Sequence, residues 1–101
     1  MPEQLMRSRY TAYSLGEIKY IEKTQRGNAA KKFNFNSAKR WAAKSRFVNL
    51  KIVQTSMHDD DPDIGYVEFI ASYIDEAGRE QSLHEHSEFR QFKGKWFYVD
   101  S

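Results

Sequence analysis

Two neighbouring segments decide the fold: Leu83-His84-Glu85-His86-Ser87-Glu88-Phe89 and Gly94-Lys95-Trp96-Phe97-Tyr98-Val99-Asp100. Lys93-Gly94-Lys95 predicts a turn, so the two segments form an antiparallel hairpin. Because side chains alternate between the faces of a strand, two sets are expected on opposite faces of residues 83–90. One face carries Leu83, Glu85, Ser87 and Phe89, and the other carries His84, His86, Glu88 and Arg90.

Two further strands are predicted upstream of this hairpin. From Phe47 the period becomes two, and Val48, Leu50 and Ile52 alternate with polar residues, as expected for a half-buried strand. The next strand has one face made of Val67, Phe69, Ala71 and Tyr73. Residues 58–63 (HDDDPD) and residues 76–79 (EAGR) predict the connecting turns. The four strands therefore form an antiparallel meander.

The first half of the chain predicts helices. Pro2 and Glu3 suit the first turn of a helix, and Gly16 suits its end near Leu15. One face of this helix carries Leu5, Met6, Arg9, Tyr10 and Tyr13. A second short helix is expected over residues 17–24 and is broken at Gly27-Asn28, and a third, capped by Asn36 or Ser37, runs to Lys44. Helices on one face of a strongly twisted sheet give an α+β cone with a pocket inside.

Composition limits the class of protein. A chain of 101 residues forms one domain, residues 1–101. It contains no cysteine, which excludes a disulfide framework, a thiol nucleophile and a thiolate zinc site. The lack of cysteine fits a reducing cytosol, and no apolar run approaches the roughly 20 residues of a membrane span. We therefore expect a cytoplasmic protein that needs no cofactor and no membrane.

Charge is distributed unevenly along the chain. Residues 19–51 contain ten Lys or Arg and one acidic residue, Glu22, which gives about +9 there and about −7 elsewhere. Aromatic side chains interleave with these cations, as in proteins that bind single-stranded nucleic acid. The alternative is a solvated helix pair whose lysine stems cover apolar surface. The candidate residues for binding an anion or nucleic acid are Lys31, Lys32, Lys39, Arg40, Lys44 and Arg46.

Four strings, in this order and spacing, carry a resemblance: PEQLMRSRYTAY, GYVEFIASY, LHEHSEF and GKWFYVD. They resemble the middle domain of the YchJ family of bacterial proteins, and the match spans most of the chain. The resemblance implies a nuclear transport factor 2-like fold, also called cystatin-like, which agrees with the cone predicted from the strand and helix patterns. It implies no known reaction, because the family is functionally uncharacterised.

The chain departs from the family pattern in two places. Family members usually carry SEC-C motifs, which are short cysteine-rich zinc-binding segments, and this chain has none. It is then either a natural single-domain member or a piece of a longer protein. The family pattern also has a Trp-His pair after a threonine, where this chain has Thr24-Gln25-Arg26-Gly27. No zinc site and no role for that histidine are carried over.

Glu85 is the most informative candidate for chemistry. It shares a strand face with Leu83 and Phe89, so it is expected to point inward, and a buried carboxylate needs a cation or hydrogen bonds. Arg9, on the apolar face of the first helix, is the expected partner, with Arg7 second. The pair is either a structural ion pair that joins helix to sheet or a pocket carboxylate that acts as a base or a ligand anchor. The other candidate pocket residues are aromatic: Tyr10, Tyr13, Trp41, Phe69, Tyr73, Phe89 and Trp96.

Two clusters have metal-ligand residue types without favouring a metal. His84, His86 and Glu88 share a strand face, but that face is expected to be exposed to solvent. His58 and the aspartates that follow it do not match the spacing of a calcium loop, and a solvated turn is favoured.

The function that these patterns favour is a non-catalytic binding or protein-interaction module. It would bind an unknown small ligand or protein partner, or form a homodimer through the open sheet face. A small-molecule enzyme that uses Glu85 is the alternative, and nucleic-acid or anion binding by residues 19–51 is the second alternative.

Overall fold

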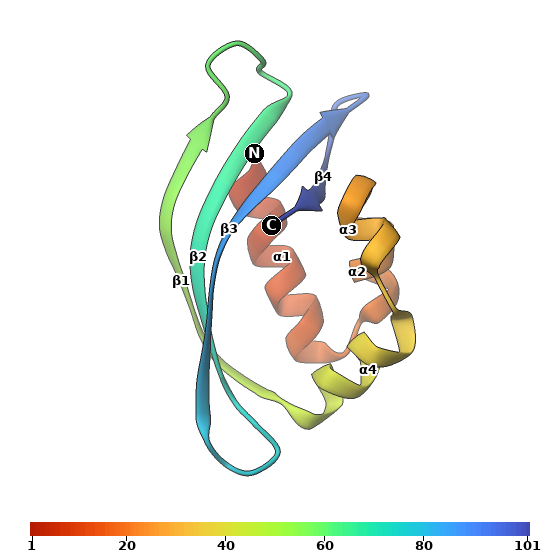
Figure 1. Cartoon of the computed structure of the whole chain (residues 1–101), viewed down its shortest axis with the longest axis vertical. Coiled ribbons are helices and arrows are strands. Elements are labelled where there is room, and N and C mark those ends of the chain that lie inside the picture. The colour runs from red at the N-terminus through yellow and green to blue at the C-terminus, as the bar shows by residue number, and fades with distance from the viewer.

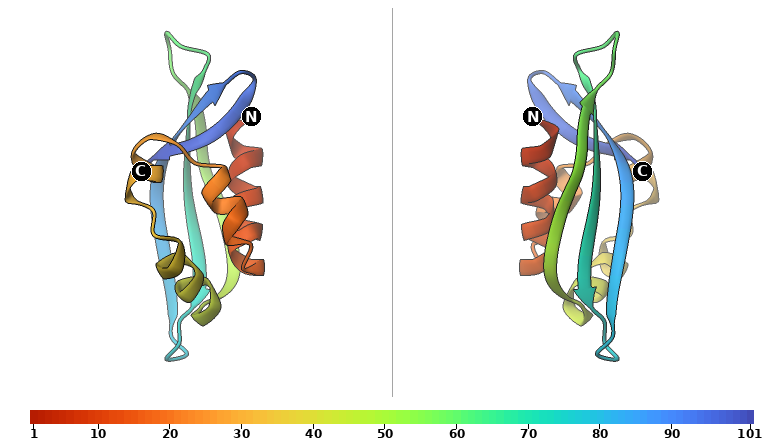
Figure 2. Two further views of the ribbon diagram at one scale, coloured as in Figure 1. Left: turned by 90° about the vertical axis from the view of Figure 1, so that its right-hand side faces the viewer. Right: turned by 90° about the vertical axis from the view of Figure 1, so that its left-hand side faces the viewer.

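A computed structural model describes residues 1–101. The chain folds as helices on one face of a curved sheet, with overall extents of 45 × 26 × 18 Å. Helix α1 lies along the concave face, and α2, α3 and α4 continue the helical layer toward the far edge of the sheet (Figure 1). Seen edge-on, the sheet curves around the helices, and its other face is left uncovered (Figure 2).

The elements follow the predicted order of helices first and strands second. In chain order they are α1 (Pro2–Leu15), α2 (Ile18–Lys23), α3 (Gly27–Lys32), α4 (Phe35–Lys44), β1 (Arg46–Met57), β2 (Ile64–Ile74), β3 (Glu80–Phe92) and β4 (Lys95–Asp100). None of the helices is both long and apolar enough to cross a membrane.

Helix α1 begins and ends where its sequence predicts. Pro2 occupies its first turn, and Gly16 follows it in the left-handed conformation, with φ 74°, which a residue without Cβ adopts at little cost. Met6, Arg9 and Ala12 are buried; Met6 packs into the core with the sheet, and Arg9 binds Ile21 and Thr24. Arg9, a charged residue among apolar neighbours, is part of the pocket described below.

The other helices differ from the prediction in two respects. The break expected at Gly27 is instead the start of a further helix, α3, which buries none of its side chains and therefore leaves no apolar period to detect. Helix α4 is capped by Asn34, whose side chain accepts a 2.8 Å hydrogen bond from the Ser37 amide. The predicted caps, Asn36 and Ser37, lie inside the helix.

The sheet is the predicted antiparallel meander, in the order β1-β2-β3-β4. One face assignment in it is wrong. Val48 was expected to point inward with Leu50 and Ile52, but a β-bulge between Phe47 and Asn49 changes the phase of the strand. As a result Phe47 joins the inward set, and Val48 is 47% exposed.

The core lies between α1 and the centre of the sheet. Its buried cluster is Met6, Val67, Phe69, Ala71 and Phe89, with Trp96 and Tyr98 among the side chains packed against it. Phe89 and Val67 are completely buried. The inward faces predicted for β2 and β3 are thus confirmed.

The outer edge of β4 is protected by the segment between α2 and α3. The Tyr98 amide donates to the carbonyl of Thr24 at 2.9 Å, and the Arg26 amide donates to the carbonyl of Tyr98 at 3.0 Å. A free strand edge invites pairing with another chain, so this short parallel bridge closes that edge. It also brings residues 24–26 against the end of the chain.

Candidate functional site: an aromatic pocket with an unpaired carboxylate

A pocket of about 190 Å³ lies between the N-terminal helices and the concave face of the sheet. Its walls are mainly apolar and come from α1, α4 and all four strands. The lining residues are Met6, Arg9, Tyr10, Tyr13, Trp41, Phe47, Phe69, Ala71, Leu83, Glu85, Ser87 and Tyr98.

Aromatic rings form one wall of the pocket. Trp41 makes edge-to-face contacts with Tyr13 and Phe47, with ring centroids 5.5 Å and 5.2 Å apart. Tyr10 packs edge-on against Phe47 at 5.7 Å. Such contacts are favoured by the ring quadrupoles and fix the orientation of the wall. The bulge in β1 is what allows Phe47 to enter this cluster.

Arg9 is buried in the wall of the pocket but does not pair with a carboxylate. Its guanidinium donates to the Ile21 carbonyl at 2.9 Å, to Thr24 Oγ1 at 2.8 Å and to Gln25 Oε1 at 3.2 Å. It also lies over the Tyr98 ring, 4.7 Å from the centroid. Burial lowers the pKa of Arg9 from its ordinary value, although a guanidinium remains charged at neutral pH.

The ion pair expected between Arg9 and Glu85 is therefore not formed. Arg7, the second expected partner, binds Glu3 on the surface at 3.1 Å instead. The reason is geometric, because α2 and the segment between α2 and α3 supply Arg9 with three neutral acceptors. Charge patterning does not indicate these partners, since two of the three acceptors are neutral polar side chains and one is a backbone carbonyl.

Glu85 points into the pocket, as its strand position predicted. It lies opposite Phe69 in the β2–β3 register and is half-buried. Its carboxylate accepts no hydrogen bond from the chain and forms no ion pair with any Lys, Arg or His. A carboxylate in such a pocket is usually paired, so Glu85 is free to bind a ligand, while the charge of Arg9 in the same lining is already engaged.

Hydroxyl groups complete the polar part of the wall. Burial raises the pKa of Tyr13 and Tyr98, and the nearby charge of Glu85 adds to both shifts. Both phenols therefore keep their protons at neutral pH and can donate hydrogen bonds. The Ser101 hydroxyl links two wall residues, because it bonds to the Tyr98 hydroxyl and, at 2.8 Å, to Ser87 Oγ.

The structure brings together most of the candidate pocket residues. Tyr10, Tyr13, Trp41, Phe69 and Glu85 line the pocket, with Arg9. Three candidates do not. Phe89 is sealed in the core, Trp96 packs against that core, and Tyr73 lies behind Trp41.

Sequence reasoning missed other lining residues. Ala71, Leu83 and Ser87 share strand faces with Phe69 and Glu85, so the same alternation could have added them. Phe47 was not predicted because the bulge between Phe47 and Asn49 changes the alternation of β1. Met6 and Tyr98 gave no signal that distinguishes a pocket wall from a core.

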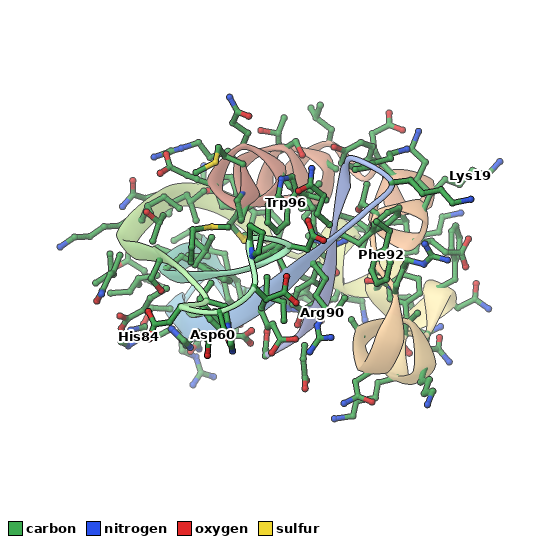
Figure 3. All side chains as sticks on the ribbon, turned by 90° about the horizontal axis from the view of Figure 1, so that it is seen from above. Lys19, Asp60, His84, Arg90, Phe92 and Trp96 are labelled. Carbon is green, nitrogen blue, oxygen red and sulfur yellow. The ribbon has the colours of Figure 1, made fainter.

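The histidines on the outer face of β3 each have a separate partner. His84 Nε2 contacts Glu68 Oε2 at 2.7 Å, and His86 stacks on Tyr66 with centroids 5.6 Å apart. Figure 3 shows His84 on the side of the sheet away from α1, whereas Trp96 lies toward it. No group of three or more His, Asp or Glu side chains is arranged to hold a metal ion.

The acidic turn after β1 is held by local hydrogen bonds. His58 Nδ1 accepts from the Asp60 amide at 3.1 Å, and Asp61 Oδ1 accepts from the Asp63 amide at 2.9 Å. These side chains therefore cap the turn, as side chains of this kind commonly do.

The candidate cations of residues 19–51 lie on the outside of the helical layer. Lys31 and Lys32 are on α3, and the other candidates, Lys39, Arg40, Lys44 and Arg46, are on α4 and at the start of β1. All six are exposed. Lys44 contacts Glu76 at 3.5 Å and is the one residue of the ten bases in the segment that forms an ion pair.

The chain is similar to one described protein family and to known bacterial proteins. The family model described as the YchJ middle NTF2-like domain matches residues 1–101. The UPF0225 protein GSU1048 of Geobacter sulfurreducens is 40% identical over 98 residues, which are 97% of this chain and 60% of that protein. The UPF0225 protein PC1_1977 of Pectobacterium carotovorum is 36% identical over 98% of this chain and 64% of its own length. This chain thus spans less than two thirds of these relatives.

Two solved structures have the same fold. A SEC-C motif containing protein from Rhodopseudomonas palustris matches with a TM-score of 0.85 and 37% identity, over 98% of this chain and 75% of that chain. A SEC-C motif containing protein from Psychrobacter arcticus matches with a TM-score of 0.81 and 27% identity, over 99% of this chain and 59% of that chain.

Proposed function

We propose that this chain, which belongs to the YchJ middle-domain family and has its NTF2-like fold, is a non-catalytic module that binds a small organic molecule. One observation carries the proposal: a half-buried carboxylate without a partner faces a pocket whose other walls are mostly aromatic and aliphatic. Concave apolar sites with a few convergent polar groups are typical of ligand pockets.

The volume limits the size of the ligand. At about 190 Å³ the pocket is smaller than the range of about 300–1,000 Å³ typical of drug-sized ligands. A compact molecule with a handful of non-hydrogen atoms fits this space, and a nucleotide does not.

Binding without catalysis fits the arrangement better than an enzyme does. Glu85 acting as a general base would need a second group to stabilise the charge that develops in the transition state. The cation of the pocket is Arg9, and its donors are directed to Ile21, Thr24 and Gln25. Of the phenols in the wall, Tyr98 is already bonded to Ser101, so Tyr10 and Tyr13 are the remaining phenol donors, and we assign Glu85 the role of anchoring a ligand and not of catalysing its conversion.

A screen of compact fragments by heteronuclear NMR tests the proposal. We expect fragments to shift the amide signals of residues that line the pocket, such as Ala71 and Glu85. The variant Ala71→Leu, which places extra methyl groups at the wall, should abolish these shifts. Ala43→Leu on the exposed side of α4 is the matched control. If no fragment shifts pocket signals at millimolar concentration, the proposal is wrong.

A second candidate function is the binding of an acidic partner such as nucleic acid by the helical layer. It is favoured by the ten bases of residues 19–51, of which nine form no ion pair. Binding of this kind weakens steeply with salt. We expect retention on heparin that falls in the double variant Lys39→Glu/Arg40→Glu and is unchanged in Lys93→Glu. Elution of the unmodified protein at low salt would exclude this function.

A further inference from the structure

The unpaired carboxylate indicates which ligand the pocket prefers. We propose that the pocket binds a compact organic monocation, an alkylated amine whose positive head lies between Glu85 and the aromatic wall. This inference rests on the proposed binding function and adds the charge and shape of the ligand to it.

The charge of the ligand follows from Glu85. A half-buried carboxylate is stabilised when a cation or donors come within reach, and the chain supplies neither to this side chain. A neutral ligand without a donor would cover Glu85 and leave it unpaired, which costs binding free energy, and a neutral donor would supply a hydrogen bond but no opposite charge. An anion would add repulsion. A cation alone gains from the charge that is already in place.

The aromatic wall favours the same chemistry. Tyr13, Trp41 and Phe47 line the pocket together, and aromatic rings attract cations through their quadrupoles, most strongly at Trp. Desolvating an alkylated ammonium costs less free energy than desolvating an unsubstituted ammonium, because the methyl groups share and cover its charge. Such a head can touch both the rings and the carboxylate.

Arg9 explains why the ligand is expected to carry a single charge. Its guanidinium is already engaged by three neutral acceptors and by the Tyr98 ring, so it offers little to an anion. Its positive charge nevertheless lies in the wall of the same pocket and would repel a second cationic group. The single positive head of the ligand is therefore expected beside Glu85, on the side of the pocket that faces the aromatic wall.

Three molecules of one shape separate the contributions of charge and fit. Choline is the cation, 3,3-dimethylbutan-1-ol is its neutral carbon isostere, and 3,3-dimethylbutanoate is a matched anion. In NMR titrations of the full chain we expect choline to bind at least about tenfold more tightly than the alcohol. We expect the anion to bind most weakly of the three. The amide signals of Glu85 and its pocket neighbours should report the binding.

Variants at two glutamates of β3 assign the effect to Glu85. Glu85→Gln should reduce choline affinity about tenfold and leave affinity for the alcohol within about twofold. Glu85→Asp, which keeps the charge, should retain the preference for the cation. Glu88→Gln, on the outer face of the same strand, is the control and should change neither affinity. The amide spectrum of each variant establishes that it is folded.

The outcomes distinguish this inference from the function on which it rests. If neutral fragments enter the pocket but choline does not bind more tightly than its isosteres, the monocation is wrong and the binding function stands. If the anion binds most tightly and Glu85→Gln strengthens the binding of the anion, the proposal of a monocation is also wrong. If neither fragments nor isosteres enter the pocket, both proposals fail.

Discussion

Arg9 and Glu85 line the same pocket without binding each other. Arg9 instead joins the first helix to the end of the chain, because its guanidinium binds residues 21–25 and lies 4.7 Å from the centre of the Tyr98 ring. Glu85, on β3, is left without a partner. The buried Arg9 therefore has a structural role, and the half-buried Glu85 is available to a ligand.

Replacing Arg9 should destabilise the fold. Arg9→Met keeps most of the apolar stem but leaves the acceptors of Thr24 and Gln25 unsatisfied, so we expect a loss of roughly 2–4 kcal/mol in the free energy of unfolding. Urea unfolding followed by circular dichroism measures it. Arg7→Met removes an exposed ion pair with Glu3 and should change stability by less than about 1 kcal/mol. Equal losses in the two variants would contradict the role assigned to Arg9.

Replacing Glu85 should have little effect on stability or improve it. Had Glu85 paired with Arg9, its removal would have cost roughly 3–5 kcal/mol because a buried cation would lose its partner. Since no such pair exists, Glu85→Gln is expected to change the free energy of unfolding by no more than about 1 kcal/mol. A gain in stability would fit a functional residue that is retained at the expense of stability. A large loss would show that Glu85 has a structural partner after all.

The fold could be predicted from the sequence because its signals are local. The end of α1 needs a residue that tolerates positive φ, and Gly16 supplies it. The alternation through Val67, Phe69 and Ala71 and through Ser87 and Phe89 describes two faces that the core then buries. Helix α3 was missed because it has no buried face, and a helix without one has no apolar period.

The site was predicted less completely because its geometry depends on contacts that are distant in sequence. A bulge in β1 decides that Phe47, not Val48, faces inward, and a bulge leaves no trace in a pattern of alternation. The partners of Arg9 are a backbone carbonyl of α2 and two neutral side chains of the segment between α2 and α3. Charge matching alone selects a carboxylate for it and so gives the wrong partner.

The turn between β2 and β3 should make stability depend on acidic pH. Asp75 accepts hydrogen bonds from the Gln81 side chain at 2.9 Å and from the amides of Arg79 and Ala77 at 2.9 and 3.0 Å. These bonds hold the pKa of Asp75 below its ordinary value, with the Gln81 side chain contributing most.

Because the folded pKa is the lower one, the carboxylate stabilises the fold above the unfolded value of about 3.9. That contribution is lost as the pH falls from there through the folded pKa. Thermal melts between pH 2 and pH 5 should therefore show a steeper decline for the unmodified chain than for Asp75→Asn, with Asp59→Asn as the control. In an NMR titration, Gln81→Ala should raise the pKa of Asp75. Parallel melting curves for Asp75→Asn and the unmodified chain would contradict this explanation.

The stability of the fold should depend on glycine at position 65, because β2 passes close to the start of α1 there. A Cβ at position 65 would lie 2.7 Å from Pro2 Cγ and 3.1 Å from Met57 Sδ, closer than non-bonded atoms normally approach. We expect Gly65→Ala to cost roughly 1–3 kcal/mol through overpacking. Pro2→Ala removes the nearest atom, so the double variant Pro2→Ala/Gly65→Ala should lose less than the sum of the single losses. Additive losses, measured by urea unfolding, would mean that the strain at Gly65 comes from Met57 or from the strand itself and not from the helix.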